Sequence, residues 1–417
     1  MPDLLPVDTS KWQATEETLR ALFSSFGFDE IRTPFLEPTE LFARSVGEST
    51  DIVEKEMYTF VDKNGESITL RPEGTASVVR AFTQHNLAHA SPVSRFFYMG
   101  PMFRHERPQK GRLRQFHQVG AELLGSAHPL CDVEVMKLLH EVALEFQVEN
   151  PVLEINSVGD SECRGPYREK LIGFLRGQRQ RLCETCQKRT ETNPMRVFDC
   201  KNPVCQTVLS DAPMIVDHLC PSCDGHFSSV RRALESSDVP FTVNKKIVRG
   251  LDYYTKTAFE MVAGGLGSQN TVGAGGRYDD LVASFGGPAT PAVGFAIGME
   301  RLLLSSRKIV DTAPIRIDVI PLSPVLEQDA FILASGLRTG LRSKAAVSVT
   351  ALLGFASLKS ALRQSNRTQS TFALLLGEDE KAKGTVMLKN LANHTQRECP
   401  REELANLILG EIHAPSN

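Results

Sequence analysis

The chain has 417 residues, more than a single hydrophobic core usually serves, so we expect two or three domains. Its hydrophobic content of 41% and charged content of 23% are ordinary for a globular protein, and no apolar run reaches the roughly 18 residues of a membrane span. The formal net charge of −3 excludes an overall basic field, and the first ten residues do not resemble an export signal, so we expect a cytoplasmic protein in which any nucleic-acid site is local.

The first predicted helix is defined by the spacing of Leu19, Leu22, Phe23 and Phe26, which form one apolar face. Gly27 is expected to end it. Residues 28–31 then predict a buried strand, and the proline that follows at position 34 suits a sheet edge or an interface.

A short polar cluster follows at residues 71–75, with the sequence Arg-Pro-Glu-Gly-Thr. Glu73 and Thr75 lie two residues apart, so both could point at a cationic amine. On its own this signal is weak.

Residues 103–116 predict a β-hairpin with a basic loop, because apolar residues flank a segment that contains Pro108 and Gly111. Beyond the loop, strand alternation puts a cation, an aromatic ring, an amide and a carboxylate on one face. These residues are Arg114, Phe116, Gln118, Gly120 and Glu122. Such a face suits a nucleotide and a small zwitterion, because without ligands its polar groups would be costly to bury. A solvated outer face is the alternative.

Residues 160–235 contain most of the nine cysteines and few strand-like runs, which predicts a small inserted domain. Two Cys-x-x-Cys pairs, Cys183 with Cys186 and Cys220 with Cys223, favour a tetrahedral zinc site that would stabilise a thin core. Reduced surface and core thiols are the alternative.

Four further segments complete the pattern. Residues 249–254 and 273–279 combine an arginine and tyrosines with glycines that allow close backbone approach to a ligand. In residues 294–304, small residues are expected to open an apolar helix with Arg301 in its first turns, although an exposed arginine would be the ordinary interpretation. After residue 306, apolar strands at 315–322 and 371–376 predict a separate α/β domain.

Together these segments resemble class II aminoacyl-tRNA synthetases, and within that class the histidyl-tRNA synthetases. Pro34 is similar to motif 1, residues 103–106 to motif 2 and residues 294–301 to motif 3. Residues 249–254 resemble the histidine-specific signature. The resemblance covers nearly the whole chain. It implies an α+β fold with a six-stranded antiparallel sheet flanked by helices, a homodimer, and a C-terminal α/β domain that binds the anticodon stem-loop.

The resemblance divides the chain into four stretches. Residues 1–160 would form the first part of the catalytic domain, residues 161–235 the insertion, residues 236–306 the second part of the catalytic domain, and residues 312–412 the anticodon-binding domain. One place departs from the family pattern, because Lys256 stands where the family often has a small residue.

The implied activity is that of a histidine–tRNA ligase, which activates L-histidine with ATP and Mg²⁺ and transfers it to the 3′ end of histidine tRNA. The implied catalytic residues are Arg104 and Arg249, on either side of the α-phosphate. The histidine site would comprise Glu73, Gly74, Thr75, Gln118, Glu122, Tyr253 and Tyr254, with Glu122 and Tyr254 on the imidazole. The ATP site would comprise Arg104, Glu106, Arg114, Phe116 and Arg301, and the tRNA acceptor end would meet Arg107, Gln109, Lys110 and Arg112.

Two other functions remain open on this pattern, since a fold alone does not decide function. One is a non-catalytic paralogue such as the regulatory subunit of ATP phosphoribosyltransferase, a class that lacks the C-terminal domain. The other is an RNA-binding regulator, which would have no reason to keep Glu73, Gln118, Glu122 and Tyr254 together.

Overall fold

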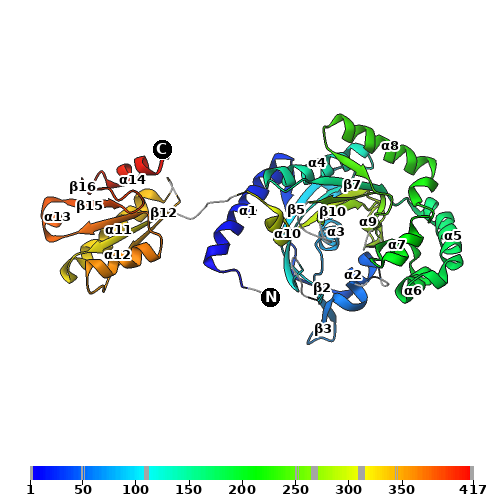
Figure 1. Ribbon diagram of the computed structural model, residues 1–417, viewed down its shortest axis with the longest axis horizontal. Helices are drawn as coiled ribbons and strands as arrows, with labels where there is room; N and C mark the ends of the chain where they lie inside the picture. The colour runs from blue at the N-terminus through cyan, green and yellow to red at the C-terminus, as the bar shows by residue number, and fades with distance from the viewer. Residues whose placement is uncertain are drawn as a thin grey trace. The chain divides into compact units, whose positions relative to one another are not determined.

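The computed structural model forms two units, Met1–Val310 and Asp311–Asn417, which are described separately below (Figure 1). It describes residues 3–47, 50, 52–107, 112–248, 251, 253–263, 271–308, 315–342, 344 and 346–413, with side chains 7, 46, 412 and 413 excepted.

The first unit is built on an eight-stranded sheet in the order β1-β5-β6-β11-β10-β9-β7-β8. Its strands are β1 (Asp29–Glu30), β5 (Ser94–Phe103), β6 (Gln115–Leu124), β7 (Val152–Ser157), β8 (Phe241–Val243), β9 (Thr255–Val262), β10 (Thr271–Arg277) and β11 (Ala292–Gly298). The six central strands pair antiparallel, and only the two short edge strands, β1 on β5 and β8 on β7, pair parallel. The expected six-stranded antiparallel sheet is therefore present, with one parallel strand added at each edge.

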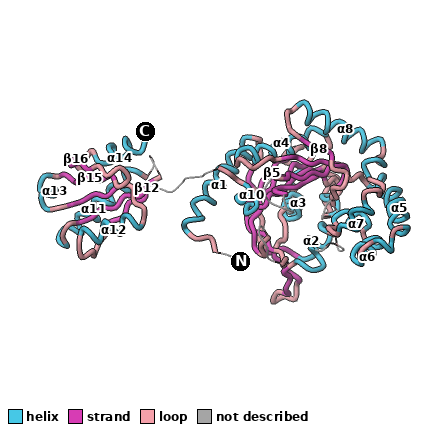
Figure 2. The backbone as a smooth tube through the Cα atoms, in the orientation of Figure 1, coloured by secondary structure: helices cyan, strands magenta, loops and turns pink. Residues whose placement is uncertain are grey.

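Helices cover both faces of this sheet (Figure 2). The helices of the first unit are α1 (Pro6–Ser25), α2 (Thr39–Val46), α3 (Thr75–Gln84), α4 (Pro129–Glu145), α5 (Ser161–Gly177), α6 (Glu184–Thr192), α7 (Pro203–Leu209), α8 (Pro221–Ser236), α9 (Leu281–Ser284) and α10 (Met299–Ser305). Helices α1, α4 and α8 contribute to the main apolar core against one sheet face. A second core, with residues of α3 and α9, lies on the other face. A small sheet, β2-β4-β3, adds the strands β2 (Leu36–Pro38), β3 (Tyr58–Val61) and β4 (Ser67–Leu70).

The predicted N-terminal helix is present and begins earlier than its apolar face, at Pro6. Leu19 and Phe23 are fully buried, and Gly27 follows the helix end with a φ of 75°. The strand expected at residues 28–31 is present as β1 but is shorter, and its expected burial was wrong, because both residues of β1 are exposed and only the preceding Phe28 is buried. Strand β1 lies at the sheet edge, so only one side of it has a strand partner.

The predicted hairpin is confirmed: β5 and β6 pair antiparallel, with Phe103 opposite Gln115. The predicted alternation holds along β6, where Val119, Ala121 and Leu123 enter the main core and the residues between them face the other way.

The apolar helix expected to open near Gly294 was wrong, because residues 292–298 form strand β11 between β6 and β10. The helix begins only at Met299, and Arg301 lies in its first turn. A seven-residue apolar run fits either structure, and here two neighbouring strands supply its hydrogen-bond partners.

Residues 161–217 are helical, with short 3₁₀ segments that include η4 (Pro194–Asp199). They share a core of their own around Tyr167, Leu171 and Leu209. They belong to the first unit by their contacts. The separate insertion domain expected at residues 161–235 stays a prediction, and the last part of that range, α8, packs into the main core.

The second unit is an α/β domain with a five-stranded sheet in the order β13-β12-β14-β15-β16. Its strands are β12 (Ile315–Pro321), β13 (Val347–Ala351), β14 (Phe372–Leu376), β15 (Thr385–Asn390) and β16 (Gln396–Pro400). Its helices are α11 (Glu327–Leu341), α12 (Leu358–Arg367), α13 (Glu378–Lys383) and α14 (Leu404–His413). The two strands predicted in this region correspond to β12 and β14.

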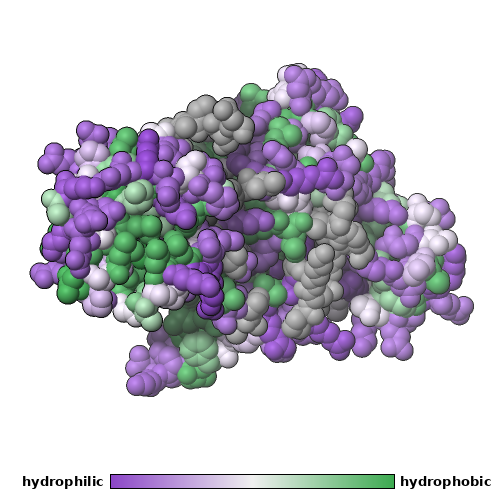
Figure 3. Space-filling model, turned by 60° about the vertical axis from the view of Figure 1, so that its left-hand side comes forward, coloured by the Kyte–Doolittle hydropathy of each residue, from purple (hydrophilic) through white to green (hydrophobic). Residues whose placement is uncertain are grey.

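Polar side chains cover most of the face drawn in Figure 3, with apolar patches between them. Among the helices of the described residues, none is both long and apolar enough to cross a membrane.

Candidate active site

A pocket of about 330 Å³ opens on the sheet face opposite the main core, over β6, β9, β10 and β11. Phe116 and Gln118 of β6 line it, as do Ala296 and Gly298 of β11 and the start of α10. The predicted polar face of β6 therefore borders a pocket and not open solvent, because β11 and the residue 71–75 segment enclose it.

One end of the pocket gathers hydrogen-bond acceptors. Glu73 is 4% exposed, and its carboxylate accepts the backbone N–H groups of Thr75 at 2.7 Å and Ala76 at 2.9 Å. Burial raises the pKa of Glu73, and these N–H groups oppose that rise. The Oε1 atom of Gln118 is also buried and has no partner among the described residues. This end can receive the three N–H donors of an ammonium group.

Glu122 lies directly behind Thr75 and is fully buried. It accepts a hydrogen bond from the Thr75 hydroxyl at 2.6 Å and another from the hydroxyl of Tyr278. Burial raises the pKa of Glu122 to about 8. The carboxyl group is thus protonated for much of the time at neutral pH in the unliganded protein.

Close backbone approach makes room for this buried group. A side chain at Gly294 would overlap the Oε2 atom of Glu122, and one at Gly276 would overlap the ring of Tyr254. The glycines noted in the sequence are therefore explained by packing. Only a residue without Cβ leaves space for the buried side chains of Glu122 and Tyr254 at these positions.

Three cations also line the pocket, on Arg104, Arg112 and Arg301. Arg104 is close to the acceptors, since its charge opposes the rise in the pKa of Glu73, and it also acts on Arg301. Arg104 lies over the Phe116 ring at 5.3 Å and donates to the Pro72 carbonyl at 2.9 Å, while Arg301 donates to the Thr271 carbonyl at 3.1 Å. Burial, followed by repulsion from Arg112, lowers the pKa of Arg301. Three mutually repelling cations favour a bound polyanion.

Two further carboxylates lie in the same pocket, and the sequence pattern did not single them out. Glu300 accepts the backbone N–H of His117 at 2.9 Å, and Glu260 accepts the Thr271 hydroxyl at 3.0 Å. Their position beside the arginines provides oxygen donors for a hard cation.

The structure brings most of the predicted site residues together. Glu73, Thr75, Gln118, Tyr253 and Tyr254, predicted for histidine, line the same pocket as Arg104, Glu106, Phe116 and Arg301, predicted for ATP. Tyr278 and Tyr98, which the sequence interpretation missed, pack around Glu122 and against the glycines of β6 and the residue 71–75 segment. Tyr278 lies in the glycine-rich segment of residues 273–279 but had been given no role, and Tyr98 looks like an ordinary core tyrosine until the register of β5 on β6 places it opposite Gly120.

The structure places other predicted residues differently. Arg112, expected at the tRNA acceptor end, lines the pocket and pairs with Glu106 at 3.5 Å. Among the described residues, Arg107 and Arg114 do not line the pocket, and Arg114 instead donates to the Glu106 carbonyl at 3.4 Å. The predictions for Arg249, Gln109 and Lys110 lie outside the described residues. Lys256 has a φ of 49°, a backbone conformation in which a glycine would be less strained.

The predicted zinc ligands do not form one cluster. Cys183 and Cys186 meet Cys200 and Cys205, whereas Cys220 and Cys223 meet Asp160 and Cys163. The pairs separate because each begins a different helix, α6 or α8, and α8 packs on α4, away from α6 and η4.

Comparisons with known proteins agree with this geometry. The family described as histidyl-tRNA synthetase matches residues 1–160 and 218–302, and the family described as anticodon binding domain matches residues 317–411. The histidine–tRNA ligase of Geobacter metallireducens is 48% identical over 412 residues, covering 98% of both chains. That of Trichlorobacter lovleyi is 48% identical, covering 95% of this chain and 93% of the relative. The structure of apo S. aureus histidyl-tRNA synthetase is 31% identical with a TM-score of 0.81, covering 98% of both chains.

Proposed function

The chain belongs to the histidyl-tRNA synthetase family, and we propose that its pocket activates histidine with ATP before the histidyl group passes to the 3′ end of histidine tRNA. The observation that carries this assignment is that one pocket combines the buried acceptors of Glu73 and Gln118 with three arginines, Arg104, Arg112 and Arg301. A regulatory paralogue is not favoured, since the similarity to histidine–tRNA ligases extends over 98% of the chain.

At the acceptor end, the ammonium group of histidine would bind Glu73, Thr75 and Gln118, with Gly74 and Tyr253 shaping the wall. Gln118 offers the acceptor that lacks a partner among the described residues, and Glu73 offers negative charge. The imidazole would lie between Tyr254 and the linked pair of Thr75 and Glu122. A site of this kind rejects apolar side chains because they would leave its buried polar groups unpaired.

The triphosphate of ATP would bind Arg104, Arg301 and Arg112, with the adenine on Phe116. Glu106 holds Arg112 in place through its ion pair. Arginine forks suit this task because each can donate two parallel hydrogen bonds to a phosphate. Arg114 and Arg249 remain proposed ATP and catalytic residues on the family resemblance alone.

The reaction needs positioning more than a protein nucleophile. A histidine carboxylate oxygen attacks the α-phosphorus, the bond to the β-phosphate oxygen breaks, and diphosphate leaves. The guanidinium groups stabilise the charge that gathers on the phosphoryl oxygens. A hydroxyl of the terminal ribose of tRNA then attacks the histidyl carbonyl carbon and releases AMP. Mg²⁺, which would be held by Glu260 and Glu300 together with ATP, would neutralise phosphate charge.

For tRNA, we propose that Arg107, Gln109 and Lys110 meet the acceptor end and that the second unit binds the anticodon stem-loop. We also propose a homodimer. Phe35 and Leu36, which follow the motif 1 proline, are each 49% exposed, which suits an interface. Sedimentation analysis would test the dimer.

The decisive experiment is ATP–diphosphate exchange with histidine, with each of the other amino acids as a control. Exchange that depends on histidine alone would support the assignment. Exchange with another amino acid, or none with an enzyme shown to be folded, would refute it.

A further inference from the structure

We propose that Cys183, Cys186, Cys200 and Cys205 bind one zinc ion that stabilises the segment of residues 161–217. Their four Sγ atoms all lie within 4.8 Å of one another, and those of Cys183 and Cys200 are 3.9 Å apart. Sulfurs bound tetrahedrally at ~2.3 Å from a zinc ion are roughly 3.8 Å apart, so the cluster already has the dimensions of such a site.

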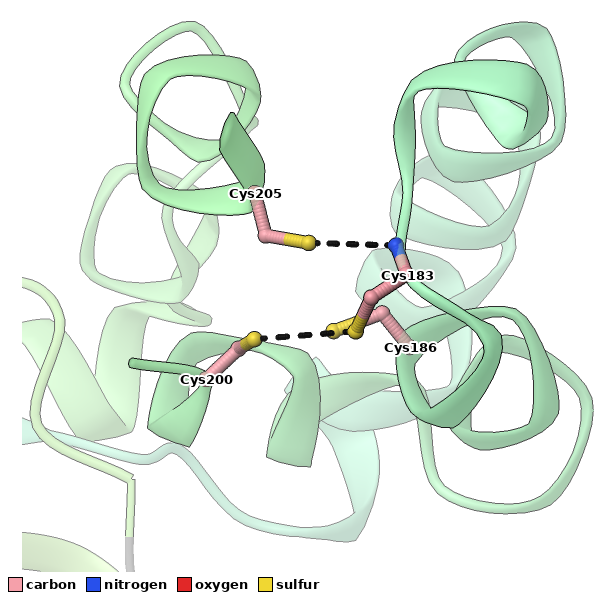
Figure 4. Close-up of side chains that lie close together, drawn as sticks. All are labelled: Cys183, Cys186, Cys200 and Cys205. Atoms are coloured by element: carbon pink, nitrogen blue, oxygen red, sulfur yellow. Dashed lines mark hydrogen bonds between the residues drawn. The ribbon is translucent and has the colours of Figure 1, made fainter. Parts of the chain in front are cut away.

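The sulfurs converge from three different elements (Figure 4). Cys183 caps the N-terminus of α6 and Cys186 lies in its first turn, Cys200 follows η4, and Cys205 lies in α7. An ion bound there would tie these three short elements together, which is what a structural zinc site does for a small core.

Backbone N–H groups also point at the sulfurs. The N–H of Cys183 donates to the Sγ atom of Cys205 at 3.3 Å, and the N–H of Asn202 donates to that of Cys200 at 3.4 Å. Hydrogen bonds of this kind stabilise the thiolate form that a metal requires. The cysteines around Asp160 accept bonds of the same kind, so these bonds support a metal without choosing between the two clusters.

Other chemistry fits the cluster less well. A disulfide is not formed, since each cysteine is a free thiol in the part of the chain that the structure describes. A cluster of several iron atoms would hold the sulfurs farther apart, because each thiolate would bind a different iron. Four thiolates converging on one point favour a single tetrahedral ion, and zinc is the common choice.

The second cluster provides an internal comparison. It has only three cysteines, Cys163, Cys220 and Cys223, with Asp160 as its fourth member. The Oδ1 atom of Asp160 already caps helix α5 by accepting the N–H groups of Glu162 at 3.1 Å and Cys163 at 3.3 Å. The four-thiol cluster is therefore the stronger metal site.

The proposed site lies in residues 161–217, between the two ranges that the family profile matches, so zinc would belong to this segment and not to the shared catalytic chemistry. The segment nevertheless reaches the histidine end of the pocket. Met195 of η4 packs in the apolar cluster that contains Tyr254, and Arg164 of α5 donates to the Tyr254 carbonyl. Zinc would thus support a wall of the histidine site without touching the substrate.

The test is metal analysis of the full chain purified under reducing conditions without added metal. We expect one zinc per chain to be lost in the double variant Cys200→Ser, Cys205→Ser. The matched control, Cys220→Ser with Cys223→Ser, should keep that ion. Zinc retained in full by the first variant, iron in its place, or an unsubstituted protein without stoichiometric zinc would overturn the proposal.

Because the double variant could fail to fold, a second measurement uses the unsubstituted protein. A thiol-blocking mercurial should release about one equivalent of zinc to a chromogenic chelator. After excess small thiol has removed the mercurial, refilling with cobalt(II) should give the thiolate-to-metal charge-transfer absorption of a four-sulfur site. Cobalt spectra without charge-transfer bands would refute the four-thiolate assignment.

Discussion

Replacing Glu122 by glutamine should make the unliganded protein more stable while making it a poorer enzyme. In the folded protein, burial raises the pKa of Glu122 from 4.5 to about 8. Between these two values the folded state binds one proton more than the unfolded state, so the free energy of unfolding falls as the pH rises, by about 1.4 kcal/mol per pH unit. At pH 7 the accumulated cost of the glutamate is roughly 3 kcal/mol.

Glutamine has the shape of the neutral carboxylic acid but does not ionise, so it avoids the free-energy cost of burying Glu122. Its carbonyl can accept from one of the two hydroxyl groups, those of Thr75 and Tyr278, and its amide can donate to the other. The stability gain should therefore be small near pH 4.5, grow towards pH 8 and then level off. At pH 7 its upper limit is about 3 kcal/mol.

Activity should change in the opposite direction. We expect the efficiency with histidine to fall roughly ten- to a hundredfold, because glutamine cannot supply the negative charge that a bound imidazole would draw from Glu122 through the Thr75 hydroxyl, and a charge-assisted hydrogen bond contributes about 1.5–3 kcal/mol. The Michaelis constant for ATP should change little, since Glu122 is bonded to Thr75 and Tyr278 and not to the arginines that line the pocket.

Both effects can be measured on one preparation. The chain has a single tryptophan, Trp12, which is 9% exposed and lies in the first unit, so its fluorescence follows the urea unfolding of that unit from pH 5 to 8.5. ATP–diphosphate exchange gives the kinetic constants. The control is Glu37→Gln, which should destabilise, because Glu37 is buried in an ion pair with Arg80 at 2.8 Å. A Glu122→Gln protein less stable than the parent throughout this range would refute the reasoning, as would unaltered efficiency with histidine.

Three further predictions follow from the site and the units. Arg301→Ala should raise the Michaelis constant for ATP about ten- to a hundredfold by loss of a phosphate contact, with histidine affinity nearly unchanged in equilibrium binding. Arg277→Ala should cost about 3–5 kcal/mol in urea unfolding, because it leaves the fully buried Asp132 carboxylate, now 3.1 Å from the Arg277 Nε atom, without its cation. Ending the chain after residue 310 should preserve ATP–diphosphate exchange but reduce tRNA charging, because tRNA affinity sums contacts with both units.

A control variant and a refuting outcome can be given for these experiments. Arg307→Ala removes an exposed arginine just after α10 and should leave the constants for ATP unaltered. An Arg301→Ala enzyme with normal ATP constants would remove that residue from the nucleotide site. Unchanged stability of Arg277→Ala would mean that Asp132 is satisfied by His226 alone, and full charging by the shortened chain would separate the second unit from tRNA binding.

The sequence predicted the site best along strand β6, where the two-residue repeat of an extended strand alone determines which face each side chain is on. Along β6 the alternation of Val119, Ala121 and Leu123 with Gln118 and Glu122 depends only on the geometry of an extended strand, so counting by two was sufficient. The same counting could not assign residues 292–298, because an apolar run of that length fits a strand or a helix until its neighbours are known.

The two-residue repeat could not predict how deeply each side chain of β6 is buried below the pocket surface. Gln118 and Glu122 share a face of β6, yet Gln118 lines the pocket whereas Glu122 lies behind Thr75. That difference is set by Thr75, which arrives from a segment far away in sequence. A pattern within one strand can therefore predict which side chains face a site, but not which of them a ligand meets first.

The cysteines show that a local motif does not predict which residues come together in space. Both Cys-x-x-Cys pairs occupy equivalent positions, with the first cysteine at the cap and the second in the first turn of a helix. This local similarity made them look like two halves of one site. Their actual partners are determined by helix packing, which brings Cys200 and Cys205 onto the first pair. These two cysteines have four residues between them instead of the two of a Cys-x-x-Cys pair. The cysteines that complete a four-sulfur cluster can thus be the ones without a motif, because an ion requires only that four sulfurs converge in space.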